Sequence, residues 1–175
     1  MRRRLAALAL VVIVAAAAYF LVIRDSTVAP RVRVPHPAAT IGSGSAAVVV
    51  SAGGAIVPWF PAPANPPLPA LPLSEPPKSG HLAGPMLQQA RVLGAAPAAL
   101  VPYVERSYYG ESGVDVMLTS GIELRFGDAS QAVRKWKAAA AVLADPSVTA
   151  LDYVDLHAPS RPAIGGSGHT LPPAP

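Results

Sequence analysis

The chain has 175 residues, of which 14 are Lys or Arg, 10 are Asp or Glu and none is Cys. This length allows one modest domain with accessory segments, and the lack of Cys excludes disulfide bonds, thiolate metal sites and a cysteine nucleophile. The formal net charge is +5 over residues 1–33 and −1 over residues 34–175. Because a nucleic-acid-binding domain needs cations clustered on its folded surface, this distribution argues against nucleic acid as a partner.

The first predicted element is a hydrophobic segment at residues 5–23. It has 19 residues without a charge or a proline, and a helix of that length is about 28 Å long, close to the ~30 Å hydrocarbon layer of a bilayer. A cleaved signal peptide with small residues at 15–17 is the alternative. Since the apolar run continues past that position to Ile23, the sequence favours a retained single-pass anchor. The Arg triplet within residues 1–4 favours a cytoplasmic N-terminus and an extracytoplasmic domain.

Proline and glycine then divide the chain. Residues 24–45 contain both and predict a flexible tether. The apolar runs 46–51 and 55–57 flank a glycine pair and predict two short strands. Residues 58–77 contain nine prolines, which predicts an extended connector over the surface of the domain. A ligand for a proline-recognition domain is the alternative for this segment.

A stretch without proline, residues 103–145, predicts the core of the folded domain. Within it, apolar residues alternate with polar ones on both sides of Gly121, which predicts a β-hairpin with one wet face. The expected elements are a helix at 85–93, a short helix at 97–103, a strand at 104–109, hairpin strands at 114–118 and 122–126, a helix at 130–143 and a strand at 149–156. In the helix at 130–143 we expect the basic side chains in water: Arg134, Lys135 and Lys137.

These elements predict an α+β fold class. The expected architecture is an N-terminal transmembrane helix followed by a small antiparallel sheet with helices packed on one face. Residues 46–166 form the expected extracytoplasmic domain, and residues 167–175, which are rich in Gly, Ser and Pro, form an expected disordered tail.

No catalytic constellation emerges from the sequence. The four His residues are scattered, and none lies in a metal-binding pattern. Asp152 and Asp155 are three residues apart on a predicted strand, so their side chains point to opposite faces and do not form an acid–base pair. Nucleophile-elbow, P-loop and dinucleotide-binding motifs are absent. We therefore expect no catalytic residue, no metal, no cofactor and no small-molecule substrate.

The strand predicted at 149–156 is followed by a tail that has no core of its own. A strand in that position leaves unpaired N–H and C=O groups at a sheet edge, where a strand of a partner protein can add. Pro159 and Pro162 support the alternative that this edge is protected from pairing. The residues alone leave both possibilities open.

Three motifs occur in a characteristic order. Residues 121–127 (GIELRFG) complete the predicted hairpin, Lys135 or Lys137 lies in the following helix, and residues 153–156 (YVDL) belong to the predicted strand. In this order the chain, over residues 46–166, resembles the β domain of the FtsQ/DivIB bacterial cell-division proteins. That family places a POTRA domain before its β domain. The 22 residues of the tether are too few to fold one, so either this chain is a form of the family without that domain or the resemblance is partial.

The resemblance implies a non-enzymatic divisome scaffold in septum formation, held in the bacterial cell membrane by a single pass. Its implied partners are division proteins of the FtsB/DivIC and FtsL type, bound by strand addition to the last strands. The implied partner-binding residues are Tyr153, Val154, Leu156, Ala163, Ile164 and Gly165. A membrane-anchored envelope enzyme and a generic extracytoplasmic binding module are the alternatives.

Overall fold

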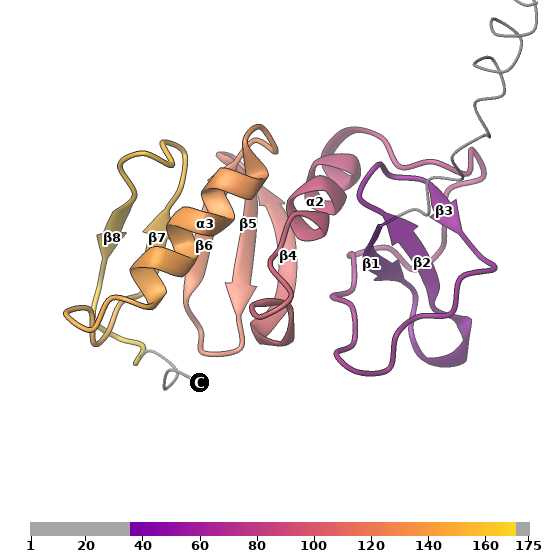
Figure 1. Ribbon diagram of the computed structural model, residues 1–175. Coiled ribbons are helices and arrows are strands. Elements are labelled where there is room, and N and C mark those ends of the chain that lie inside the picture. The colour runs from indigo at the N-terminus through magenta and orange to yellow at the C-terminus, as the bar shows by residue number, and fades with distance from the viewer. Residues whose placement is uncertain (1–35, 171–175) are drawn as a thin grey trace, which may run out of the picture. The chain divides into compact units, whose positions relative to one another are not determined.

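The computed structural model describes residues 36–170 (Figure 1). This range forms an α+β fold with two α-helices and two sheets. In chain order the elements are β1 (Pro37–Ile41), β2 (Val48–Ser51), β3 (Ile56–Val57), α2 (Gly84–Gly94), β4 (Val104–Gly110), β5 (Gly113–Leu118), β6 (Glu123–Gly127), α3 (Ala132–Leu143), β7 (Tyr153–Asp155) and β8 (Ala163–Gly165). The expected cytoplasmic tail (1–4) and anchor (5–23) lie outside the described residues. No helix within 36–170 is long and apolar enough to cross a bilayer.

β1, β2 and β3 form a three-stranded antiparallel sheet, which we call the small sheet. Because β1 lies within residues 24–45, the end of that range is a strand and not the flexible tether that its composition predicts. Ala39 and Ile41 of β1 are fully buried, and β1 contacts α2. Burial of apolar side chains against a distant helix orders a segment whose own residues do not specify a strand.

Residues that follow β3 in the chain close both edges of the small sheet. Along β1, the Thr40 N–H donates to the Pro69 carbonyl (3.0 Å), and the Leu71 N–H donates back to the Thr40 carbonyl (2.8 Å). Along β3, the Ile56 N–H donates to the Gly80 carbonyl (3.0 Å). The proline-rich connector is therefore hydrogen-bonded to β1, and no strand edge of the small sheet is left without a neighbour within the described range.

β4 to β8 form a five-stranded sheet in sequence order, which we call the large sheet. The predicted hairpin is present as the antiparallel pair β5 and β6. β6 and β7 are parallel, because α3 crosses between them and returns the chain to the end of the sheet where β6 began. The prediction of one antiparallel sheet is therefore wrong in two respects: the large sheet is mixed, and a separate small sheet precedes it.

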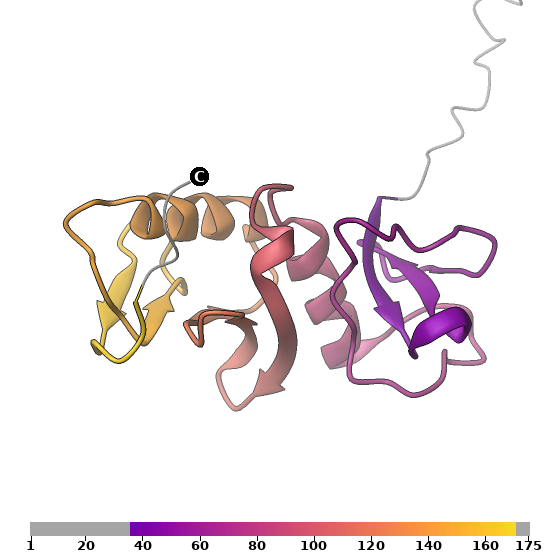
Figure 2. The same cartoon turned by 90° about the horizontal axis from the view of Figure 1, so that it is seen from below.

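Both helices pack on one face of the large sheet, as the sequence predicts (Figure 2). Trp136 of α3 is fully buried, and its indole N–H donates to the Val92 carbonyl of α2 (2.7 Å). Its ring also packs on Phe126 of β6, with 5.0 Å between the ring centroids. α2 contacts β4 and β5 on one side and β1 and β2 on the other, so this helix joins the two sheets.

Lys135 is buried, although the sequence analysis expects it in water. Only 2% of the residue is exposed. Its Nζ donates to the carbonyl of Phe126 (2.8 Å), the carbonyl of Asp128 (3.0 Å) and Oδ1 of Asp128 (2.8 Å). Lys137 is exposed. Of the two lysines considered for the helix motif, Lys135 is therefore the one that ties α3 to the end of β6.

Candidate functional site

The strand near the C-terminus is not the edge strand that the sequence predicts. β7, which lies within the predicted strand 149–156, pairs with β6 on one side and with β8 on the other. Its backbone groups are therefore used within the sheet and are closed to a partner. The prediction of an open edge at 153–156 is wrong, because the chain turns back after Leu156 and adds one more strand.

β8 occupies the edge instead. No strand within residues 36–170 pairs with its outer side. Ala163 and Ile164 are exposed, and Ile164 is a large apolar side chain with 47% of its surface accessible. The strand carries no charged residue and no proline, which are the usual features that protect a sheet edge.

β4, at the other edge of the large sheet, has such protection. Its pairing with β5 shifts register between Val104 and Arg106, which indicates a β-bulge. Glu105 and Arg106 are exposed beside this irregularity. Bulges and charged side chains disfavour the addition of another strand, so β8 is the better acceptor of the two edges.

The six predicted partner-binding residues divide into two groups. Val154 and Leu156 are fully buried and face the core, so they cannot contact a partner in the folded state. The other four gather at the β7–β8 edge of the sheet: Tyr153, Ala163, Ile164 and Gly165. Burial of alternate residues is what a strand with one covered face requires.

A row of side chains crosses the helix-free face of the large sheet and ends at β8. The Tyr108 hydroxyl donates to Oε1 of Glu123, and Nε of Arg125 donates to Oε2 of the same carboxylate (2.6 Å). The Arg125 guanidinium lies 3.9 Å from the centroid of the Tyr153 ring. A Cβ at Gly165 would come within 2.5 Å of the Tyr153 hydroxyl. The Tyr153 ring therefore covers Gly165, and β8 tolerates this only because that position has no side chain.

The charges of this row perturb one another. Burial, and then the hydrogen bond that it donates to Glu123, raise the pKa of Tyr108 to about 12. Burial raises the pKa of Glu123, but the hydrogen bonds from Tyr108 and Arg125 outweigh it and leave the pKa below its usual value. Burial raises the pKa of Asp115, whose Oδ1 has no hydrogen-bond partner in the described part of the chain. The sequence indicates only that these residues share a wet face; their contacts depend on strand register.

Two Asp–His pairs hold the chain that follows β7. Nδ1 of His157 lies 2.8 Å from Oδ1 of Asp155, and Nδ1 of His169 lies 3.0 Å from Oδ1 of Asp152. The Asp152 carboxylate also accepts the N–H of Gly168 (2.8 Å). Residues 167–170, at the start of the expected disordered tail, are thus fixed beside Asp152. Within residues 36–170, no cluster of His, Asp and Glu has a geometry that would hold a metal ion.

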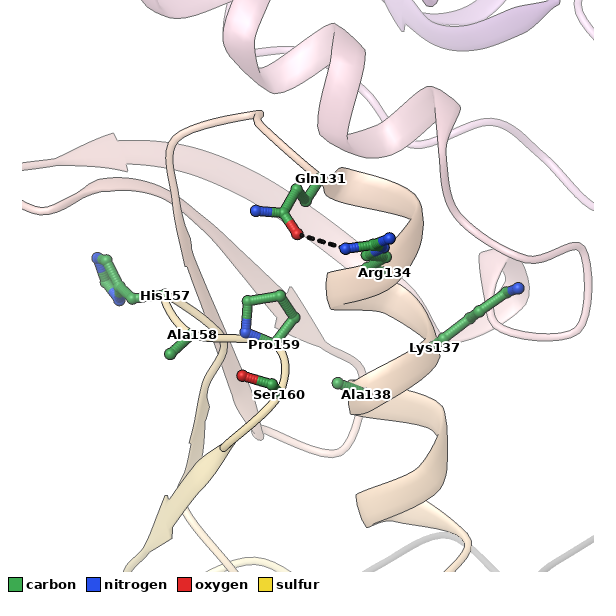
Figure 3. A pocket seen from close by; sticks show the side chains of 8 residues that line it. All are labelled: Gln131, Arg134, Lys137, Ala138, His157, Ala158, Pro159 and Ser160. Carbon is green, nitrogen blue, oxygen red and sulfur yellow. Dashed lines mark hydrogen bonds between the residues drawn. The ribbon is translucent and has the colours of Figure 1, made fainter.

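An open pocket of about 570 Å³ lies between α3 and the loop after β7 (Figure 3). The sequence analysis did not find it, because its walls come from segments that only the fold brings together. Its lining residues are Gln131, Arg134, Lys137, Ala138, His157, Ala158, Pro159 and Ser160. The Arg134 guanidinium is already engaged with Oε1 of Gln131 (3.3 Å), and Lys137 points away from the loop (Figure 3). His157, also in the lining, is paired with Asp155 (2.8 Å).

Comparison with known families identifies the domain. The family model described as "Cell division protein FtsQ/DivIB, C-terminal" matches residues 39–157, a range that begins within β1 and ends just after β7. No curated protein matches the chain. Proteins of the matched family are non-enzymatic division scaffolds, so the chain is not an enzyme and has a role in cell division. The matched range is more than half of the sequence, and the chain therefore belongs to the FtsQ/DivIB family of cell-division proteins.

Proposed function

We propose that this chain is a single-pass scaffold of the bacterial division machinery, active during septum formation. Residues 5–23 anchor it in the cell membrane, with the N-terminus in the cytoplasm and the domain outside. The domain captures an extended segment of a small membrane division protein, of the FtsB/DivIC or FtsL type, along the outer side of β8. No nucleic acid, cofactor or small-molecule substrate takes part.

The observation that carries this proposal is the state of β8. Its outer side has no neighbouring strand among residues 36–170, and it lacks charge and proline. A partner strand added there gains main-chain hydrogen bonds, while the exposed Ile164 offers an apolar contact. Of the six residues expected to bind a partner, Ala163, Ile164 and Gly165 lie on this edge strand, so strand addition is proposed at β8 and not at β7.

The row on the helix-free face supports the same proposal. Tyr153 is stacked by Arg125 and lies over Gly165, so the inner side of β8 is backed by an aromatic ring. A strand of three residues is not stable by itself. Because the Tyr153 ring holds β8 in place, less conformational entropy is lost when a partner strand adds to it.

Site-specific photocrosslinking in dividing cells tests the position of the partner. A photoreactive residue replaces Ile164 on β8 in the full chain, and the same residue replaces Tyr109 on β4 as the matched control, since Tyr109 has a similar exposure of 48%. We expect a crosslink to a small membrane division protein from β8 only. Crosslinks from β4 alone would contradict the proposed edge.

A charge substitution tests whether the contact is needed. Ile164→Lys places a cation on β8, and we expect it to abolish co-purification of the partner and septal localisation. Val133→Lys is the control, because Val133 is an exposed apolar residue of α3 that the proposal does not use. Equal loss of binding in both variants would contradict a specific role of β8.

A further inference from the structure

The small sheet and the connector up to Ser74 carry no charged side chain. Every Lys, Arg, Asp and Glu of the described range lies after Ser74, so 39 consecutive residues, 36–74, contain only neutral side chains apart from His36. The large sheet carries charged side chains on most of its strands. About a quarter of the residues of an average soluble domain are charged, so the absence of charge from 39 consecutive residues requires an explanation.

The most exposed large apolar side chain of the described range lies in this neutral part. Trp59 follows β3 and is 78% exposed. Trp59 lies in a loop, residues 58–67, in which Asn65 is the single polar residue. Single exposed apolar residues are common and need no explanation. Here, however, the indole projects from a loop that is apolar along nearly its whole length.

The backbone of this loop is also poor in hydrogen-bond donors. Five of its ten residues are prolines and have no N–H. The N–H of Phe60 is already satisfied by the Val57 carbonyl (3.1 Å). Removing an irregular segment from water costs free energy because its backbone N–H groups lose their hydrogen bonds to water. With fewer N–H groups, this loop has a smaller free-energy cost than an ordinary loop when it moves to a less polar surface.

The length of chain before the domain limits what this surface can reach. Twelve residues, 24–35, separate the apolar segment 5–23 from the first described residue. Twelve residues span at most about 40 Å when fully extended. A domain that is anchored through residues 5–23 therefore stays within one domain diameter of the lipid, whichever way it turns.

We propose that the loop 58–67 docks on the outer surface of the bilayer in which the chain is anchored, with the Trp59 indole in the interfacial layer. Trp is favoured there because its ring is apolar and its N–H remains hydrated. The neutral surface around it neither repels the anionic headgroups nor forces a charge to lose its water. The small sheet then faces lipid and leaves β8 available to a partner. This proposal depends on the anchor at residues 5–23.

Tryptophan fluorescence tests the proposal with a control built into the chain. The full protein, at one copy per nanodisc of phosphatidylethanolamine and phosphatidylglycerol, is measured with and without acyl chains brominated near the headgroup. The chain has two Trp residues, and Trp136 is fully buried. The spectrum of Trp59→Phe therefore reports Trp136, and its difference from the wild-type spectrum reports Trp59. We expect the Trp59 component to be blue-shifted and to lose most of its intensity to the brominated lipid, while the Trp136 component is unchanged.

A charge in the loop provides the second measurement. Ala62→Glu should return Trp59 to water and abolish its quenching by brominated lipid, whereas Ala98→Glu, at an exposed position outside the loop, should leave the quenching intact. Trp59 emission that is red-shifted, unquenched by brominated lipid and quenched by a soluble agent would overturn the proposal. One copy per disc excludes a second chain as the occupant. Failure of the chain to enter discs at all would overturn the anchor itself, and that outcome is distinct from an anchored chain with a hydrated Trp59.

Discussion

The hydroxyl of Tyr108 lies against the carboxylate of Glu123 on the helix-free face, and this contact has a measurable consequence. The pKa of Tyr108 is raised to about 12, chiefly by burial and next by the hydrogen bond. Because the folded-state pKa exceeds the ordinary value of 10.0, the neutral phenol stabilises the fold below about pH 10, and this contribution is lost as the pH rises towards about 12.

An alkaline titration followed by phenolate absorbance therefore has a late step that belongs to Tyr108. Tyr108→Phe should remove this step. Glu123→Gln should move it to lower pH without returning it to the ordinary value, since burial remains the larger cause. A late step that persists unchanged in Tyr108→Phe would assign it to another tyrosine and contradict the prediction.

Lys135 gives a second prediction at the same scale. Its ammonium donates to the Phe126 carbonyl and to two oxygens of Asp128. Lys135→Met keeps the volume and removes the donor, so the carbonyl of the buried Phe126 loses its partner, and we expect a loss of about 2 kcal/mol in the free energy of unfolding. Urea denaturation of the full chain in detergent measures it. The control is Lys137→Met, on the exposed side of the same helix, which should change the free energy of unfolding by less than about 0.5 kcal/mol. An equal loss of stability in the two variants would mean that the buried contacts of Lys135 contribute nothing.

Among the elements, β8 depends most on its neighbour. A Cβ at Gly165 would lie 2.5 Å from the Tyr153 hydroxyl. Gly165→Ala should therefore displace the Tyr153 ring from Arg125 and loosen β8, which faster hydrogen–deuterium exchange of residues 163–165 would report. Gly53→Ala is the control, since a Cβ there meets only the Ser51 hydroxyl, at 3.8 Å.

Shortening the ring should reverse this effect. In the double variant Gly165→Ala with Tyr153→Ser, the added methyl group has room, so exchange at 163–165 should be slower than in Gly165→Ala alone. Additive effects of the two substitutions would show that the ring does not determine how β8 packs.

The elements that the sequence predicted well are those with a long local pattern. The hairpin of β5 and β6 follows from alternation on both sides of Gly121, and α2 and α3 follow from helical spacing. β1, β7 and β8 have five, three and three residues, which is too short for local alternation to define them, and β7 also pairs with the distant β6. Helical periodicity predicts Lys135 in water because its carbonyl acceptors, Phe126 of β6 and Asp128 just after it, lie outside the helix.

The candidate site was predicted only in its general position. Tyr153 and Gly165 were both named, but the contact between them requires the register of β7 with β8, which no local pattern contains. The order of the last strands decides which one is the edge. Two prolines between them, Pro159 and Pro162, suggested protection of the edge; they lie in the connection that makes β8 possible.

At the scale of the whole described domain, α2 contacts both sheets, and we expect the two sheets to unfold as one cooperative unit. Its last residue, Gly94, lies so close to the small sheet that a Cβ there would be 2.4 Å from the Cβ of Ala52 and 3.0 Å from that of Ala38. Gly94→Ala should therefore overpack this contact and lower the free energy of unfolding by about 1–3 kcal/mol.

The same variant tests cooperativity. In the Trp59→Phe background, Trp136 fluorescence reports the core of the large sheet. We expect it and far-ultraviolet circular dichroism to give coincident urea transitions with and without Gly94→Ala, both shifted by that substitution. If Gly94→Ala leaves the urea midpoint of the Trp136 transition unchanged but lowers the urea concentration at which circular dichroism changes, the small sheet unfolds independently of the large sheet.

The contrast between β4 and β8 bears on how much of this protein a cell can safely make. β4 has a bulge and exposed charges, whereas β8 has neither. An edge without such defences is also open to unintended strands, including those of misfolded chains. We therefore expect copies produced in excess of the proposed β8 partner to aggregate, so that a cell must balance the synthesis of the two proteins.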